Sequence, residues 1–173
     1  MNGPKKVIRL LPVRPYTQEN NYECGLACVQ SILATRGLRI NKLKLKKELK
    51  TSRSLGTMPK NIKKVLRSFG LRPKEKFSGN MIDVEREIRK GKMCLVAYQA
   101  WGDKKYFETL QSGHYSLVFG YEKDYWWLMD PNVRGKRVKY RKGVRKIKKA
   151  VFEPRWKDED AQQKVYDRWY LAI

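Results

Sequence analysis

The sequence predicts an α+β fold in which N-terminal helices pack on an antiparallel β-sheet. In the first half of the chain apolar residues recur at helical spacing, and in the second half they form continuous runs of strand length. Neither an internal repeat nor a low-complexity linker interrupts this order. We therefore expect a single domain over residues 1–173, with a helical half at about 16–91 and a sheet half at about 92–173.

The first predicted helix lies in ECGLACVQSILATRG, residues 23–37. Leu26, Val29 and Leu33 share one face of this helix, and Gly37 is a natural stop. The basic segment that follows, INKLKLKKELK, is expected to form a short helix or a turn region.

Two more helices are predicted before the change of period. In TMPKNIKKVLRSFG, Thr57 is expected to cap the helix and Pro59 suits its first turn. NMIDVEREIRKG is expected to form the next helix, with Ile82 and Ile88 on its apolar face.

The predicted strands begin with the apolar runs KMCLVAYQAW, HYSLVFGYE and YWWLMDP. The turn-like EKD between the second and third runs predicts a β-hairpin. RVKYRKG, at residues 137–143, alternates like an edge strand, and RWYLAI at the C-terminus is expected to close the sheet.

The charge of the chain is unusual. Forty Lys and Arg against 17 Asp and Glu give a formal net charge of +23. Adaptation to high temperature raises Lys and Glu together, so the scarcity of acidic residues fits that explanation poorly. A field of this sign attracts polyanions such as nucleic acid.

The basic run at residues 134–149 is the candidate nucleic-acid-binding segment. No zinc-finger or RNA-binding signature accompanies it, so the expected binding is independent of base sequence and sensitive to salt. The candidate contacts are Arg134, Lys136, Arg137, Lys139, Arg141, Lys142, Arg145 and Lys146.

Membrane and export signals are not visible in the sequence. No stretch approaches the roughly 20 apolar residues that a membrane helix needs, and the apolar part of the opening segment is too short for a signal peptide. Three cysteines, Cys24, Cys28 and Cys94, do not build a disulfide framework. We expect a cytoplasmic protein without a membrane span, and association with a nucleoprotein particle is a further hypothesis.

A candidate thiol site follows from three residues. Cys24 opens the first predicted helix, where free backbone N–H groups favour a thiolate, whereas Cys28 lies one turn inside and is expected to pack in the core. His114, the sole histidine, begins one strand of the predicted hairpin, and Asp130 ends the other. The hairpin would bring carboxylate and imidazole together, so that the carboxylate can fix the tautomer of the ring and stabilise its cation.

An oxyanion site is also conceivable next to Cys24. The side-chain amide of Gln18 and the backbone N–H of Cys24 are the candidate donors. A zinc site made of the three cysteines and His114 is the alternative, but the chain lacks the C-x-x-C spacing of structural zinc ligands. Packing of buried cysteines is the other alternative. We expect neither a metal nor a cofactor.

The segments QENNYECGLAC, GHYSLVFGY and DP resemble the peptidase C39 family, the papain-like double-glycine peptidases. The resemblance covers most of the chain and implies a papain-like fold and hydrolysis of a peptide or protein substrate through an acyl-thioenzyme. It also implies Cys24 as nucleophile, His114 as base, Asp130 as orienting acid and Gln18 in the oxyanion hole. Glu23 stands where the family usually has aspartate, and the basic excess is not a family trait.

Three functional hypotheses follow. The first is a cysteine peptidase that uses these residues. The second is a non-enzymatic, basic nucleic-acid-binding protein on an idle peptidase fold, which the net charge favours. The third joins the two and is a peptidase localised or activated by a polyanion.

Overall fold

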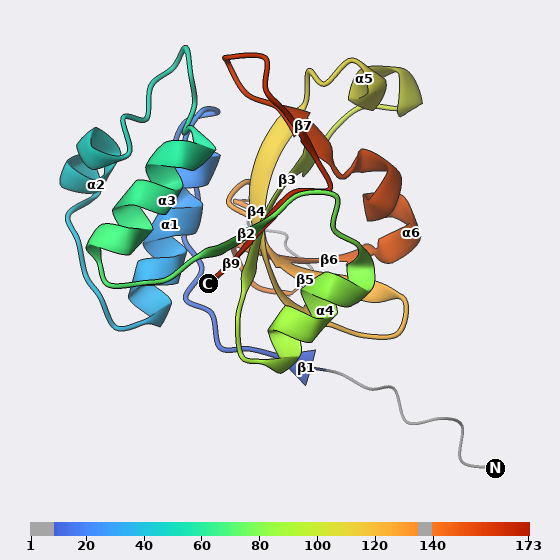
Figure 1. Cartoon of the computed structure of the whole chain (residues 1–173), viewed down its shortest axis with the longest axis horizontal. Coiled ribbons are helices and arrows are strands. Elements are labelled where there is room, and N and C mark those ends of the chain that lie inside the picture. The colour runs from blue at the N-terminus through green and yellow to red at the C-terminus, as the bar shows by residue number, and fades with distance from the viewer. Residues whose placement is uncertain (1–8, 135–139) are drawn as a thin grey trace.

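The computed structural model describes residues 9–134 and 140–173 of the chain, and Figure 1 shows its arrangement. Within these residues seven strands form one antiparallel sheet in the order β2-β9-β3-β4-β5-β6, and β1 pairs with β4. The strands of this sheet are β1 (Arg9–Leu10), β2 (Lys74–Lys76), β3 (Cys94–Gln99), β4 (Gly113–Tyr121), β5 (Tyr125–Met129), β6 (Val144–Lys148) and β9 (Tyr170–Ala172). A separate hairpin consists of β7 (Lys157–Glu159) and β8 (Val165–Asp167).

Helices cover both faces of the sheet. One group, at the blue and green end of the chain in Figure 1, lies on one face, whereas α4 and α6 lie on the other. The first group is α1 (Cys24–Thr35), α2 (Lys42–Glu48) and α3 (Pro59–Ser68), and the remaining helices are α4 (Met81–Arg89), α5 (Lys104–Glu108), α6 (Lys149–Phe152) and the 3-10 turn Glu153–Arg155. Because both faces are covered, β3 is buried along its whole length, which explains its continuous apolar sequence.

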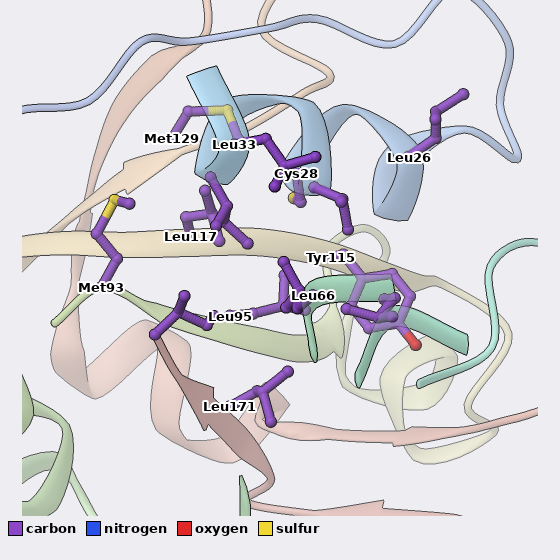
Figure 2. Close-up of a cluster of buried hydrophobic side chains, with 14 of the residues drawn as sticks. Leu26, Cys28, Leu33, Leu66, Met93, Leu95, Tyr115, Leu117, Met129 and Leu171 are labelled. Carbon is purple, nitrogen blue, oxygen red and sulfur yellow. The ribbon is translucent and has the colours of Figure 1, made fainter. Parts of the chain in front are cut away.

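The core on the first face is built around α1. Leu26, Cys28 and Leu33 of this helix are fully buried. Figure 2 shows Cys28 and Leu33 between the helix and β4, where Leu117 lies, whereas Leu26 points away from β4. The predicted apolar stripe is therefore buried, but Leu26 does not face the sheet. Cys28 is a packing residue, and burial raises the pKa of its thiol well above the ordinary value.

The core on the opposite face is aromatic. Trp126, Phe152 and Trp156 are buried there, and the rings of Trp126 and Phe152 have centroids 4.9 Å apart. Val84 and Ile88 of α4 complete this cluster from the helical half of the chain. The central sheet thus separates two hydrophobic cores and supports both.

Several sequence predictions are confirmed. The hairpin of β4 and β5 exists with its turn at residues 122–124, and β3 lies where the first apolar run predicted it. The C-terminal segment joins the sheet as β9, between β3 and β2. The basic segment at residues 40–50 contains the helix α2. The division into two halves is less strict than expected, because β2 lies in the helical half and pairs with β9 at the end of the chain.

Three local predictions are wrong. Thr57 does not cap α3, which has Met58 at its N-cap, because the Thr57 hydroxyl shares a 2.8 Å hydrogen bond with Thr51 instead. Ile82 is 61% exposed, because a capping box at the start of α4 turns Val84 toward the core in its place. The edge strand expected at residues 137–143 is not found at residues 140–143, which form a bend and a turn before β6, and residues 135–139 lie outside the described part of the chain.

Candidate active site

Cys24 is the first residue of α1, at the place predicted for a reactive thiol. The preceding residue, Glu23, makes no side-chain cap on this helix. The backbone N–H groups of the first turn are therefore not covered by a capping side chain and remain available to a bound group.

The Glu23 carboxylate is instead tied to α2. It is 2% exposed and accepts hydrogen bonds from Lys46 at 2.7 Å and Lys42 at 3.1 Å. Burial alone would raise the pKa of Glu23, but the two lysines outweigh burial and lower it to about 2. The start of α1 is thus fixed by an ion-paired carboxylate directly before the cysteine.

Gly25 allows α1 to approach the segment before α3. A Cβ atom at this position would lie 2.7 Å from the Cβ of Thr57 and 3.2 Å from the ring of Tyr115. Because real Cβ atoms do not come so close to other carbon atoms, the close packing beside Cys24 requires glycine there.

His114 and Asp130 meet because of the register between β4 and β5. Leu117 pairs with Met129, so the next residues along bring Asp130 opposite Ser116, one diagonal step from His114. The imidazole Nε2 lies 2.8 Å from Oδ1 of Asp130, and both side chains are almost completely buried. The juxtaposition expected from the hairpin is therefore present.

The surroundings of His114 favour the protonated form of its ring. Burial disfavours its cation, but the hydrogen bonds to Asp130 and to Cys24 outweigh burial and raise the pKa of His114 to about 9. Since Nε2 is engaged by Asp130, the other ring nitrogen, Nδ1, is left for the thiol. The imidazole therefore interacts with the Cys24 thiol on one side and with the Asp130 carboxylate on the other.

Asp130 is held by several groups besides the imidazole. Its Oδ1 also accepts the backbone N–H of Asn132 at 2.9 Å, and its own N–H donates to the carbonyl of Gly143 at 2.9 Å. Arg145 of β6 lies on the other oxygen, with its Nε 3.2 Å from Oδ2. Burial would raise the pKa of Asp130, yet His114, Arg145 and the Asn132 N–H together lower it.

Gln18 lies in the loop before α1 and is 3% exposed. Its backbone N–H donates to the carbonyl of Pro131 at 3.0 Å, which places the loop beside the end of β5. One amide proton of its side chain goes to the carbonyl of Asn20 at 3.0 Å, and Oε1 has no hydrogen-bond partner among the described residues. The amide group retains a second N–H for another acceptor.

A cavity of about 230 Å³ opens at Cys24 and His114. Its other walls come from the loop before α3 and from the hairpin of β7 and β8, and no sequence signal predicted the second wall. The lining residues include Tyr22, Thr57, Met58, Gly113, Asp158 and Glu159.

Asp158 was missed by sequence reasoning. Its Oδ1 accepts a 2.9 Å hydrogen bond from Nε2 of Gln99, which also donates to the carbonyl of Lys157 at 3.0 Å. Gln99 is fully buried at the end of β3, so it docks the β7 strand on the central sheet. Burial raises the pKa of Asp158 to about 7.

The predicted nucleic-acid contacts have varied surroundings. Arg134 donates to the backbone carbonyls of Gln18 at 3.3 Å and Glu19 at 3.2 Å, and Arg141 donates to that of Val13 at 3.1 Å.

Further along the run, Arg145 pairs with Asp130, and Lys146 pairs with Glu122 at 2.8 Å. Lys142 is exposed. Lys136, Arg137 and Lys139 lie outside the described residues.

Other candidate centres are not supported. Within residues 9–134 and 140–173, no group of three His, Cys, Asp or Glu side chains is placed to hold a metal ion. Cys28 and Cys94 are buried free thiols, and burial raises the pKa of both well above that of an ordinary thiol. None of the described helices has the length and apolar character needed to cross a membrane.

The comparisons with known proteins agree with this architecture. The model of the peptidase C39 family matches residues 13–159, whereas no curated protein matches the chain. Among solved structures, a double-glycine motif protease from an AMS/PCAT transporter, solved with its leader peptide, is 18% identical with a TM-score of 0.60, over 94% of this chain and 91% of that one.

Two further structures share the fold. The peptidase domain of Streptococcus ComA, a bifunctional ABC transporter, is 16% identical with a TM-score of 0.66, over 91% of this chain and 95% of that one. A protein described as a C39-like peptidase from Bacillus anthracis is 13% identical with a TM-score of 0.68, over 98% of this chain and 97% of that one. The chain belongs to the peptidase C39 family and is a cysteine peptidase with a papain-like α+β fold.

Proposed function

We propose that the peptidase hydrolyses its substrate through an acyl-thioenzyme formed on Cys24. The imidazole of His114 takes the thiol proton, and the sulfur attacks the carbonyl carbon of the scissile peptide bond. The C–N bond then breaks as the imidazolium returns the proton to the leaving amine. Water, deprotonated by the same ring, releases the acid product and restores the thiol.

The developing oxyanion needs donors that are already in place. The backbone N–H of Cys24 lies at a helix start without a side-chain cap, and the second amide proton of Gln18 is the other proposed donor. Within the described part of the chain, Oε1 of Gln18 has no hydrogen-bond partner, which supports a role for this buried amide beyond local packing.

The single observation that carries this proposal is the set of interactions that connects the thiol of Cys24, the imidazole of His114 and the carboxylate of Asp130 beside the cavity. Cys24 interacts with His114, whose other nitrogen lies 2.8 Å from the Asp130 carboxylate. A buried imidazole with a pKa of about 9 between a thiol and a carboxylate favours the thiolate–imidazolium pair of a cysteine peptidase.

The proposed substrate is a peptide segment that lies in the cavity beside Cys24. One solved relative holds a leader peptide, and this supports a peptide with a double-glycine motif as the first probe. In this proposal the substrate peptide lies in the space between the start of α1 and the β7 strand.

Two measurements test the proposed nucleophile. The Cys24→Ala and His114→Ala variants are each expected to lose cleavage of a quenched fluorescent double-glycine peptide by about 10³-fold or more. The Cys94→Ala variant removes a thiol from the opposite core and is expected to retain cleavage.

Iodoacetamide mapping provides the second measurement. Cys24 is expected to react first in the folded protein, because Cys28 and Cys94 are fully buried. Preferential labelling of either buried thiol, with Cys24 unmodified, would contradict the assignment.

The net charge supports a second candidate function, in which the peptidase is localised on a polyanion. Exposed lysines and arginines of α2 and α3, among them Lys44, Lys47, Lys64 and Arg67, add to those of the basic run. Titration with generic DNA and RNA across salt concentrations tests this function, and a log affinity that falls linearly with log salt is expected. Absence of binding at physiological salt would remove it.

A further inference from the structure

Arg145 occupies an unusual position for a member of a basic run. It lies on β6 in register with Leu128 of β5, so its side chain reaches the end of the β5 strand where Asp130 follows. Its Nε lies 3.2 Å from Oδ2 of Asp130. The side chain is 32% exposed, so the guanidinium reaches inward from the surface.

The contact is an ion pair more than a hydrogen bond. At 3.2 Å the charges are close, but the Arg145 N–H does not point at the oxygen, and the buried Nε has no hydrogen-bond partner among the described residues. Its main effect on Asp130 is therefore Coulombic, which agrees with the direction in which it moves the pKa of that carboxyl.

The two oxygens of Asp130 have separate partners. Oδ1 accepts from Nε2 of His114 at 2.8 Å and from the N–H of Asn132 at 2.9 Å, whereas Oδ2 faces Arg145. The carboxylate thus shares its negative charge between an imidazole on one side and a guanidinium on the other.

We propose that Arg145 is a positioning residue of the peptidase reaction, which holds Oδ2 of Asp130 and limits how strongly that carboxylate stabilises the His114 cation. The inference rests on the proposed function of His114 and Asp130 and assigns a partner that neither the family match nor the relatives name. It also gives one member of the basic run a role inside the protein.

The chemical reason lies in the step that breaks the C–N bond and forms the acyl-thioenzyme. The imidazolium must release its proton to the leaving amine, and a ring held too firmly in its charged form is a weaker acid. Arg145 places a positive charge beyond the carboxylate, which opposes the imidazolium and keeps its acidity in a useful range.

The charged and titratable groups around His114 come from several helices and strands. Asp130 and Arg145 approach from β5 and β6, Cys24 from α1, and Asp158 from β7. Tyr98 of β3 lies edge-on to the imidazole, with ring centroids 5.9 Å apart, and burial raises the pKa of its phenol well above the ordinary value, so it stays neutral. Arg145 is thus the cation of this set.

The chain has one histidine, so an NMR titration reports His114 without overlap. In the Arg145→Gln variant the midpoint of this titration is expected to rise by about one pH unit, the effect of removing a unit charge several ångströms away. The Arg145→Lys variant is expected to keep the wild-type midpoint. Lys148→Gln, an equal charge change at the exposed end of β6, is the matched control and is expected to leave the midpoint unchanged.

Steady-state kinetics provide a second test of the proposed role of Arg145. Arg145→Gln is expected to lower kcat on the double-glycine peptide about three- to tenfold with little change in KM, and Arg145→Lys to restore most of it. A merely structural loss would open the site and move the His114 midpoint down toward 6.5, and that result would overturn the inference.

An unchanged midpoint in Arg145→Gln, or an equal rise in the Lys148→Gln control, would also overturn it. If the wild type cleaves no peptide while Arg145→Gln moves the midpoint as expected, the proposed peptidase chemistry fails but the charge coupling stands. If cleavage is normal in all variants and the midpoint does not move, the proposed function stands and Arg145 has no part in it.

Discussion

His114 combines deep burial with a charge that burial should suppress. The residue is 2% exposed, yet hydrogen bonds to Asp130 and Cys24 raise its pKa to about 9 against burial. Hydrogen bonding to the charged form therefore outweighs desolvation at this residue. The single-histidine sequence makes this balance directly measurable.

The pH dependence follows from the sign of that shift. Because the folded pKa of His114 is raised from 6.5 to about 9, its contribution to stability is complete below about pH 6.5 and is lost as pH rises through about 9. We expect the free energy of unfolding to fall over this window, and the His114→Gln variant to lack this part of the fall. Urea denaturation at a series of pH values checks it, and equal slopes in both proteins would contradict it.

Asp130 provides the next test at a single residue. Asp130→Asn keeps the shape of the side chain but removes the charge that holds the imidazolium, so the pKa of His114 is expected to fall from about 9 toward 6.5. Cleavage of the probe peptide is expected to fall about 10²- to 10⁴-fold. NMR titration and steady-state kinetics measure the two effects, and an unchanged midpoint would show that Asp130 does not stabilise the ring.

At the scale of elements, the start of α1 is held by its neighbours. The Glu23 carboxylate, buried and ion-paired with Lys42 and Lys46, joins α1 to α2 directly beside Cys24. The N-terminal end of α1 is thus positioned by a carboxylate that pairs with α2 and does not cap the N–H groups of α1.

Removal of the Glu23 charge is expected to weaken the contact between α1 and α2. Glu23→Gln should lower the free energy of unfolding at pH 7 by about 1–3 kcal/mol, because two lysines lose a buried charged partner. The pKa of Glu23 is lowered from 4.5 to about 2, so the difference between the proteins should vanish as pH falls through that range. Glu48→Gln, on the exposed end of α2, is the control, and an equal loss there would contradict the prediction.

The β7 strand depends on the close approach of Gly113. A Cβ atom at this position would lie 2.5 Å from Oδ1 of Asp158, which Gln99 holds in place. Gly113→Ala is therefore expected to cost about 1–3 kcal/mol and to increase hydrogen exchange in β7 and β8. A double-mutant cycle with Asp158→Ala should recover part of the loss, and strict additivity would show that the clash is not its cause.

For the whole molecule, net charge opposes folding. The described ion pairs compensate only locally for a formal charge of +23, and unpaired like charges repel one another in the compact state. Salt screens this repulsion over about 10 Å at 0.1 M.

We therefore expect added sodium chloride to raise the Tm from low ionic strength. The shift should be about 2–4 °C for each kcal/mol of repulsion that is screened in a chain of this size. Calorimetry at matched pH checks it, and a Tm that falls with salt would show that attractive ion pairs dominate the net charge.

Much of the fold follows from local patterns. The 3.6-residue recurrence of Leu26, Val29 and Leu33 and the apolar run of β3 depend on the residues themselves, and Gly37 follows the end of the first helix. The pairing of His114 with Asp130 could also be anticipated, because a short hairpin turn determines which strand ends meet.

Local patterns fail where several partners compete. Thr57 could have capped α3 but bonds Thr51, and Ile82 lost its place in the core to Val84 through a capping box. Both outcomes depend on small differences between alternative hydrogen bonds, which composition and spacing do not rank.

By itself, then, the sequence determined the main helices, the central strands and the meeting of His114 with Asp130, since period and hairpin length act over short distances along the chain. The approach of Cys24 to His114, which lie 90 positions apart in the sequence, depends on the packing of α1 on the sheet. Only the tertiary structure decided that Arg145 faces Asp130, that Glu23 pairs with two lysines of α2, and that β7 walls the cavity. In a chain with 40 basic residues each acidic group has many possible partners. Coulomb attraction selects among them by distance in the folded state, which sequence separation does not reveal.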